Sequence, residues 1–259
     1  MPENAKSERW QRRLSGLSLA LKQTLGFLFV LAAPLMPAHG VAEPGLQFVS
    51  YDWLWERVNT KIEFDDLKHR QKYLPIEGLY EVNGARFGER FAGQFLGRGA
   101  PGSNIEDFDV LSGTPSSPLT ILPGKPNENI TILRSNSRHI GVGLYGESWV
   151  GYPQGASGGE GAVSIYFDQD QMGFGFRVQA SYGRNFYTMG QVIISCFDTS
   201  GAALGTVVFD SFKWDALHSI AVTRTNAAKD IRGCSIENTD PKGVLYDDFI
   251  FMAPLRFVS

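Results

Sequence analysis

The chain has 259 residues and a formal net charge of −3, from 24 Lys and Arg and 27 Asp and Glu. Without residues 1–42, which hold five basic and two acidic side chains, 19 basic and 25 acidic side chains remain, a net charge of −6. This acidic balance disfavours nucleic acid and anionic membrane surfaces as partners. It is compatible with divalent cations and neutral glycans, and the length suits one large domain or two small ones.

Residues 1–42 have the pattern of a secretory signal peptide. A basic segment from Lys6 to Lys22 precedes an apolar run, Leu25 to Leu35, that is shorter than the ~20 residues needed to span a bilayer. Small residues follow, and cleavage is expected after Gly40 or Ala42. We therefore predict a secreted or periplasmic protein whose mature chain has no transmembrane helix. A retained N-terminal anchor is the alternative, because the basic segment is unusually long.

Short β-prone runs, separated by Gly, Asp and Asn turns, dominate the chain after residue 60, and amphipathic helices are almost absent. Such a pattern predicts an all-β fold of the β-sandwich type, and the long return between the first and last strands favours a jelly roll. Asp168–Gln171 is predicted to be a turn. The expected strands are residues 62–67, 79–87, 130–133, 140–144, 161–167, 172–178, 190–197, 204–209, 219–223, 230–237 and 244–251.

One domain is expected at residues 43–259, with its core at about 60–252. Residues 97–129 are rich in Gly, Pro, Ser and Asn and are predicted to be a long loop region with short extended pieces. Hydrophobic residues recur there too often for a disordered linker. The aromatic stretch Leu46–Trp55 is predicted to be either an irregular strand or a turn of helix.

Two pairs of adjacent aspartates lie in the first and last expected strands. Neighbouring side chains in a strand point to opposite faces, so one member of each pair should point inward or lie at the strand edge. An inward carboxylate is costly unless a cation or a donor meets it. We predict that the first and last strands lie side by side and share a structural calcium ion, which takes about six to eight oxygen ligands. Its predicted ligands are Glu63, Asp65, Asp66, Asp247 and Asp248.

The alternative is that these carboxylates cap turns and accept backbone N–H groups.

Cys196 and Cys234 also allow two readings. Both lie in strand-like runs of a chain predicted to be exported, where oxidation is permitted. A bridge between them would close a loop of about forty residues and stabilise the fold by roughly 4 kcal/mol in the chain-entropy model. Two buried free thiols are the alternative, because a sequence does not give the separation of the Cβ atoms.

Four segments carry a family resemblance: Ile62–Leu67, the hairpin Val163–Gln171 with Phe174–Phe176, the turn at Phe197–Gly205, and Gly243–Phe251. They resemble bacterial secreted, lectin-like β-sandwich domains that are common in exported proteins with PEP-CTERM sorting tails. The resemblance covers roughly residues 60–252. It implies a jelly roll similar to concanavalin-like lectins and carbohydrate-binding modules, some of which hold a structural calcium. After Ala253 no Pro-Glu-Pro motif follows, so sorting by that route is not expected.

Aromatic residues beside polar ones mark two further segments, Trp149–Tyr152 and Tyr182–Asn185. Sugar rings bind to flat aromatic faces flanked by planar hydrogen-bonding groups, so we predict a shallow glycan site there. The alternative is that these aromatic side chains cover the edge of the sandwich, since large aromatics usually bury most of their area. The predicted glycan ligands are Trp149, Tyr152, Tyr182, Arg184 and Asn185.

Catalytic motifs are poorly supported. Ser157 fits Gly-x-Ser-x-Gly but lacks the strand before it and the helix after it that a nucleophile elbow requires. We therefore predict a non-catalytic module that binds a polysaccharide or the extracellular matrix. The first alternative is a structural or interaction protein of the envelope or biofilm, with a protein partner and no small ligand. A less favoured one is a glycoside hydrolase or lyase, which needs paired carboxylates about 5–9.5 Å apart.

Overall fold

The computed structural model describes residues 45–64, 73–99, 108–124, 130–134, 140–143, 162–180, 191–213, 216–239 and 244–254. Within these ranges the chain is almost entirely β-strand, with one short helix, α1 (Tyr51–Trp55). This is the all-β class expected from the sequence. No helix of the described part is long and apolar enough to cross a membrane. Residues 42–259 group into one unit.

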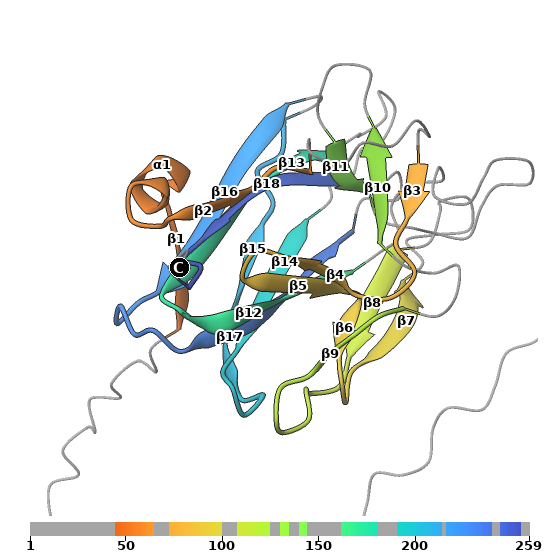
Figure 1. Cartoon of the computed structure of the whole chain (residues 1–259), viewed down its shortest axis with the longest axis horizontal. Helices are drawn as coiled ribbons and strands as arrows, with labels where there is room; N and C mark the ends of the chain where they lie inside the picture. Colours follow the sequence, from red (N-terminus) through yellow and green to blue (C-terminus); the bar gives the residue numbers. More distant parts are fainter. Residues whose placement is uncertain are drawn as a thin grey trace, which may run out of the picture. The chain divides into compact units, whose positions relative to one another are not determined.

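Sheet A is antiparallel and includes the last strand of the chain near its centre (Figure 1). A short strand, β2 (Thr60–Ile62), pairs with that last strand from outside the main path of the sheet. Segments from the start and the end of the described chain therefore meet in one sheet. The main path, in spatial order, is β1 (Leu46–Val49), β16 (Leu217–Arg224), β13 (Gly173–Ala180), β18 (Val244–Phe251), β11 (Ile140–Gly143), β10 (Thr131–Arg134) and β3 (Tyr73–Pro75).

Sheet B is also antiparallel and packs against sheet A (Figure 1). Its spatial order is β15 (Ala203–Phe209), β14 (Val192–Phe197), β17 (Ile231–Asn238), β12 (Val163–Gln171), β5 (Ala85–Gly88) and β4 (Tyr80–Val82). Two short antiparallel pairs stand apart from both sheets. They are β6 (Arg90–Phe91) with β9 (Ile121–Leu122), and β7 (Phe95–Gly99) with β8 (Phe108–Ser112).

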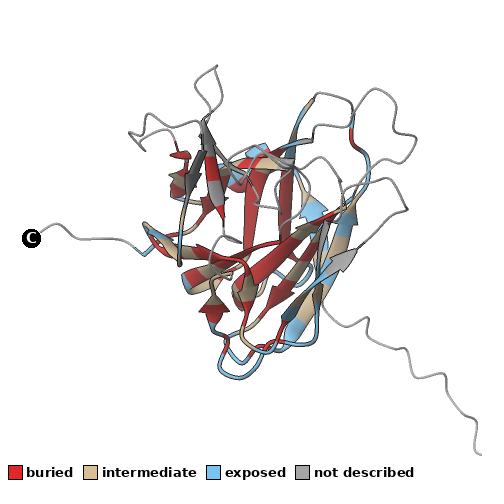
Figure 2. Cartoon of the chain, turned by 90° about the vertical axis from the view of Figure 1, so that its right-hand side faces the viewer, coloured by how far each residue is buried: buried red, intermediate tan, exposed pale blue. Residues whose placement is uncertain are grey.

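The hydrophobic core lies between the facing sides of the two sheets (Figure 2). Side chains alternate across a strand, so every second residue of β12 enters the core, as Ile165 and Phe167 do. The ring of Phe167 lies 5.7 Å from that of Phe174 on β13, and Phe176 lies 5.5 Å from Phe249 on β18. Two antiparallel sheets joined through an aromatic-rich core give a sandwich-like arrangement.

Most strands expected after residue 130 are confirmed, from β10 to β18. The turn expected at Asp168–Gln171 is wrong, because β12 continues to Gln171. The polar side chains of this run find partners in other parts of the fold. Arg232 Nε donates to Asp170 Oδ1 at 2.8 Å, and the Gln171 amide bonds both the N–H and the C=O of Met252 at 2.9 and 2.8 Å. Because the polar side chains are hydrogen-bonded in this way, the run continues the strand and does not end it.

The region 97–129 contains two short strands in its described part, β8 and β9, where short extended pieces were expected at Phe108–Leu111 and Leu119–Leu122. The hairpin of β7 and β8 includes both Gly99 and Phe108. The backbone N–H of Leu111 in β8 donates to Glu237 Oε2 of β17 at 2.7 Å. Burial raises the pKa of Glu237, and this hydrogen bond acts in the opposite direction. The hairpin is therefore attached to sheet B through a half-buried carboxylate.

The stretch Leu46–Trp55 contains both predicted alternatives, strand β1 followed by helix α1. The Ser50 hydroxyl accepts a hydrogen bond from the N–H of Trp53 at 3.4 Å, which caps the helix N-terminus. Leu54 is fully buried and packs with Ala221 of β16 and Ile250 of β18. The helix therefore lies on the outer face of sheet A, the face opposite the core.

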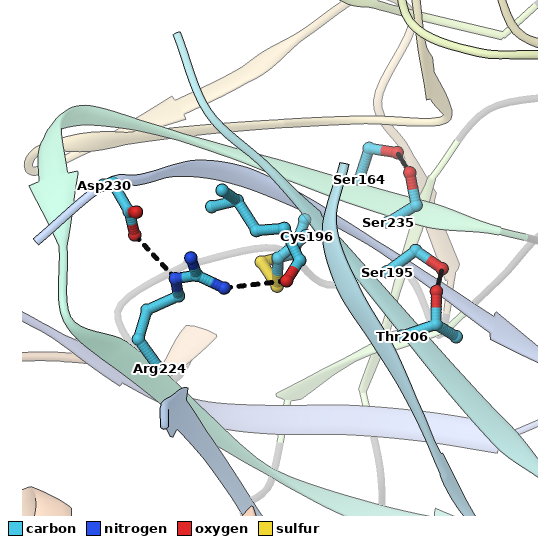
Figure 3. Close-up of a disulfide and its surroundings, with 9 residues drawn as sticks. Ser164, Ser195, Cys196, Thr206, Arg224, Asp230 and Ser235 are labelled. Carbon is cyan, nitrogen blue, oxygen red and sulfur yellow. Dashed lines mark hydrogen bonds and ion pairs between the residues drawn. A yellow bond between two sulfur atoms is a disulfide. The ribbon is translucent and has the colours of Figure 1, made fainter. Parts of the chain in front are cut away.

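Cys196 and Cys234 form a disulfide, the first of the two readings that the sequence allowed (Figure 3). They lie directly opposite each other in β14 and β17, and both are fully buried. They are 38 residues apart in sequence, so the bridge contributes about 4 kcal/mol in the chain-entropy model. The bridge joins two neighbouring strands within sheet B.

A buried arginine connects the two sheets near this disulfide (Figure 3). Arg224, at the end of β16 in sheet A, is 5% exposed. Its Nε donates to Asp230 Oδ1 at 2.8 Å, and its Nη1 donates to the carbonyl of Leu204 in β15 at 2.7 Å. The charged guanidinium is satisfied on both sides, so it holds the edge of sheet B against sheet A at this end.

Candidate functional site

A strand near the start of the domain pairs with the last strand, as predicted, but it lies at Thr60–Ile62, antiparallel to Phe249–Phe251. Glu63 and Phe64 of the expected strand 62–67 are not in a strand. The same edge of β18 pairs with β11 at Leu245–Tyr246. The aspartate pair Asp247–Asp248 lies between these two partners, at a position that neither β2 nor β11 covers. The pair therefore sits in a break along one edge of β18.

A β-bulge interrupts β18 at this pair. Three residues of β13, Gly175–Arg177, lie opposite four residues of β18, Asp247–Ile250. Asp248 has a φ of 51°, in the left-handed region that aspartate and asparagine enter more readily than other non-glycine residues. Because of the extra residue, Tyr246 and Phe249 both enter the core although they are three positions apart. Neither aspartate belongs to that core; the pair lies at the strand edge, which is the second of the two positions expected from regular alternation.

The carboxylate of Asp248 is held between two cations. Lys61 Nζ lies 2.8 Å from Oδ1, and Arg177 Nη1 lies 2.8 Å from Oδ2. The Asp248 side chain is only 13% exposed, so solvent screens these contacts weakly. Lys61 also contacts the carboxylate of Glu63, and the Tyr51 hydroxyl donates to the backbone carbonyl of Asp248 at 2.7 Å. The cluster therefore joins α1, β2, β13 and β18.

The pKa values of Tyr51 and Lys61 both rise in this cluster. For Tyr51, burial is the main cause, and the neighbouring Asp248 carboxylate raises the pKa further. For Lys61, burial alone would lower the pKa, but hydrogen bonds to Asp248 and Glu63 outweigh it. The folded protein therefore favours a neutral Tyr51 and a charged Lys61.

The predicted calcium ligands are only partly placed, because Asp65 and Asp66 lie outside the described residues. Of the others, Asp248 and Glu63 contact Lys61, and Asp247 Oδ1 accepts the N–H of Asp248 at 2.8 Å. Among the described residues, no three or more His, Cys, Asp or Glu side chains gather so that they could hold a metal ion. Of these three carboxylates, Asp247 makes the contact expected from the alternative, since it accepts a backbone N–H, whereas Asp248 and Glu63 pair with cationic side chains. Calcium stays a prediction.

The predicted glycan site lies outside the part of the chain that the structure describes. Its residues fall between 144 and 161 or between 181 and 190, two ranges without described positions. The prediction of a shallow aromatic site there is therefore neither confirmed nor contradicted. The residues concerned are Trp149, Tyr152, Tyr182, Arg184 and Asn185.

Helix α1 carries exposed aromatic side chains that the sequence analysis did not identify as a site. Trp53 is 40% exposed and Trp55 is 44% exposed. The guanidinium carbon of Arg57 lies 4.2 Å from the centre of the Trp53 ring, and Arg57 Nη1 donates to the Trp53 carbonyl at 2.7 Å. A sequence signal for part of this arrangement exists. In a helix, Tyr51 and Leu54 share one face and Trp53 lies away from it, so the spacing marks Trp53. Trp55, four residues after Tyr51, carries no such signal.

No protein-family model, characterised protein or solved structure matches this chain. The resemblance to lectin-like secreted domains therefore stays an interpretation of the sequence segments that carry it. In the described structure, the features that bear on function are side chains exposed on the surface, the indoles of α1 and several large apolar residues.

Substitution of Asp248 by asparagine should destabilise the protein by about 2 kcal/mol, because Lys61 and Arg177 would lose a charged partner in a largely buried place. Asparagine tolerates the left-handed backbone, so the variant isolates the charge from the bulge. Chemical denaturation measures the change. Glu56→Gln is the matched control, because it removes the exposed ion pair with Arg57 and should cost less than about 0.5 kcal/mol. Equal losses in the two variants would contradict the role of Asp248.

Alkaline pH should weaken the fold through Tyr51 and Lys61. Folding raises both pKa values, so their stabilisation is complete below the unfolded values of about 10 and 10.4 and is lost as pH rises through the folded values. We expect the free energy of unfolding to fall above about pH 10. Tyr51→Phe should show a shallower fall, since phenylalanine has no proton to lose. Identical slopes for the two proteins in urea titrations at pH 8 to 11 would contradict this assignment.

Proposed function

We propose that this protein is an exported, non-catalytic β-sandwich module that binds a glycan, with the indole rings of Trp53 and Trp55 as its binding platform. The observation that carries the proposal is the exposure of both rings on one short helix fixed to a sheet. Trp53 and Trp55 leave 40% and 44% of their area exposed, a sizeable flat surface for side chains of this size. Held on a rigid element, exposed rings offer flat contact area to a ligand at a small cost in conformational entropy.

The surroundings of the two indoles suit a sugar. Leu54 and Tyr51 anchor α1 on sheet A, and the Tyr51 hydroxyl bonds the bulge at Asp248, so the helix orientation is fixed from below. Asp52 and Glu56 on the exposed side of the helix are planar groups that can accept hydrogen bonds from sugar hydroxyls. Arg57 supplies donors and stacks on Trp53. A flat apolar face beside planar polar groups is the arrangement expected of a glycan site.

Export is supported by three independent features. Residues 1–42 have the pattern of a signal peptide. The disulfide between Cys196 and Cys234 belongs to an oxidising compartment. The third feature is the set of segments that resemble secreted lectin-like domains. The same resemblance leads us to propose a jelly-roll topology and a structural calcium ion near β2 and β18.

A second candidate function is that of an interaction protein of the envelope or biofilm. Exposed apolar side chains away from α1 favour it, namely Phe48, Val208 and Leu217. Apolar side chains that gather on a surface and stay exposed often mark contacts with another protein. The two functions do not exclude each other, because they use different parts of the molecule.

Glycan binding is tested by titrating the protein with a panel of soluble polysaccharides and measuring tryptophan fluorescence and calorimetric heat. We expect Trp53→Ala and Trp55→Ala each to weaken binding about tenfold, equivalent to about 1.4 kcal/mol. Phe95→Ala is the matched control, because Phe95 is also an exposed aromatic residue but lies on the hairpin of β7 and β8. It should leave binding unchanged.

Two further variants locate the site. If Trp149→Ala and Tyr182→Ala abolish binding while both α1 variants retain it, the platform is the pair of segments predicted from the sequence and not α1. If no polysaccharide of the panel binds, glycan binding is rejected and the interaction role remains.

Structural calcium is tested by thermal melting with and without EGTA. Since Lys61 and Arg177 already neutralise Asp248, we expect the ion to depend on Asp65 and Asp66. Chelation should lower the melting temperature of the wild type, and added calcium should restore it. An Asp65→Asn/Asp66→Asn variant should melt at the same temperature in both buffers. A wild-type melting temperature that EGTA leaves unchanged would reject the calcium ion.

A further inference from the structure

Strand β16 has one edge that is only half covered. β13 pairs with it from Leu217 to Thr223, whereas β1 pairs on the other side only from Ala221 to Arg224. β1 ends at Val49, because the next residue caps α1 and the chain leaves the sheet. Within the described residues, no strand pairs with the remaining edge of β16, Leu217–Ile220.

The backbone groups at this edge can be assigned. Arg224 N–H donates to the carbonyl of Met172, toward β13, at 3.0 Å. Since successive residues of a strand direct their backbone groups to opposite edges, Ile220 also faces β13. Leu217 and Ser219 therefore direct their N–H and C=O groups to the uncovered edge. These groups have no hydrogen-bonding partner in the described part of the chain.

A groove runs beside this edge. Its volume is about 360 Å³, and Phe48, Val208, Phe209, Asp210 and Ser219 line it, among other residues. It therefore lies between the uncovered edge of sheet A and strand β15 of sheet B. Phe48 and Val208 are each 44% exposed, so apolar surface on both sides of the groove faces solvent. The combination of an open backbone edge and apolar walls is what an added strand needs.

The walls of the groove are firmly packed. The Phe209 ring lies 4.8 Å from Phe212 and 5.6 Å from His218, and the Phe48 ring lies 6.3 Å from Phe209. His218 Nε2 in turn accepts the N–H of Lys213 at 3.0 Å. A ligand would therefore meet a largely preformed surface, which lowers the cost of binding.

We propose that this groove binds an extended peptide segment of a partner protein by β-strand addition to Leu217 and Ser219. The segment would continue the line of β1 along β16. Because the groove lies between the edges of two sheets, a single extended chain fits it better than the edge of a second folded copy.

The charge of the groove indicates the chemistry of the segment. Asp210 lines it and is exposed, and its carboxylate has no cation among the described residues; Ser211 Oγ donates to it at 3.2 Å. A segment in which apolar residues alternate with Lys or Arg would place apolar side chains on Phe48 and Val208 and a cation beside Asp210. This surface gives the interaction role a defined site and is independent of glycan binding at α1.

The test is a phage-displayed library of random dodecapeptides, selected on the full-length protein. Selected peptides should alternate apolar and basic residues, and their synthetic versions should bind at least tenfold more weakly to Val208→Glu and several-fold more weakly to Asp210→Asn. Thr206→Glu is the matched control, since Thr206 is exposed on the same face of β15 but outside the groove lining. It should bind as the wild type does.

A second arm leaves the protein unaltered and changes the peptide. Two methylated forms of the peptide are made, one with the odd and one with the even backbone nitrogens methylated. Strand addition uses only one of these two sets of N–H donors, so one form should lose binding and the other should keep it. Equal affinity of the peptide and both methylated forms would overturn the proposal, as would a selection that yields no peptide sensitive to Val208→Glu. A concentration-dependent dimer that Val208→Glu dissociates would also overturn it and assign the groove to a second copy of this chain.

Discussion

The bulge in β18 determines how sheet A can be built, because this strand pairs with β13 on one edge and with both β2 and β11 on the other. A regular strand would place one of two adjacent aspartates in the core, at a cost of several kcal/mol. The bulge instead places Asp248 in the left-handed region, which costs about 1 kcal/mol. Ion pairs with Lys61 and Arg177 then stabilise the carboxylate. The bulged strand is therefore less costly than a regular one, and it allows both Tyr246 and Phe249 to reach the core.

The strands could be predicted because their signals are local: alternating apolar residues, as in β12 and β17, indicate the buried face directly. Two cysteines allow only one disulfide within the chain, so the sequence left open only whether it forms. The neighbouring run Asp168–Gln171 looked like a turn, since its polar residues find their partners, Arg232 and Met252, far away in the sequence.

The candidate site was predicted in outline and missed in detail for the same reason. The meeting of the first and last strands followed from the acidic pairs that they share. The bulge did not, because it depends on the register of β18 against β13. Nor could the two cations be assigned, since Lys61 and Arg177 lie on different strands and nothing in the local sequence marks them as partners of Asp248.

A single position, Ser50, connects the surface of α1 with the groove beside β16. It ends β1 and caps α1, so the chain leaves sheet A at this point. The early end of β1 leaves half of β16 uncovered, and the helix that follows carries Trp53 and Trp55 into solvent. Both surfaces therefore result from one change of chain direction, although they offer different chemistry to a ligand.

The sulfur bridge of sheet B has a consequence for the durability of the molecule. Residues 197–233, which include β15 and β16, lie within the covalent ring that Cys196 and Cys234 close. A protease that cuts one peptide bond inside this ring produces no free fragment, because both new ends remain tied to the body of the protein. Strands β14 and β17 also cannot slide past each other after such a nick, so a singly nicked molecule would keep the alignment on which its core depends.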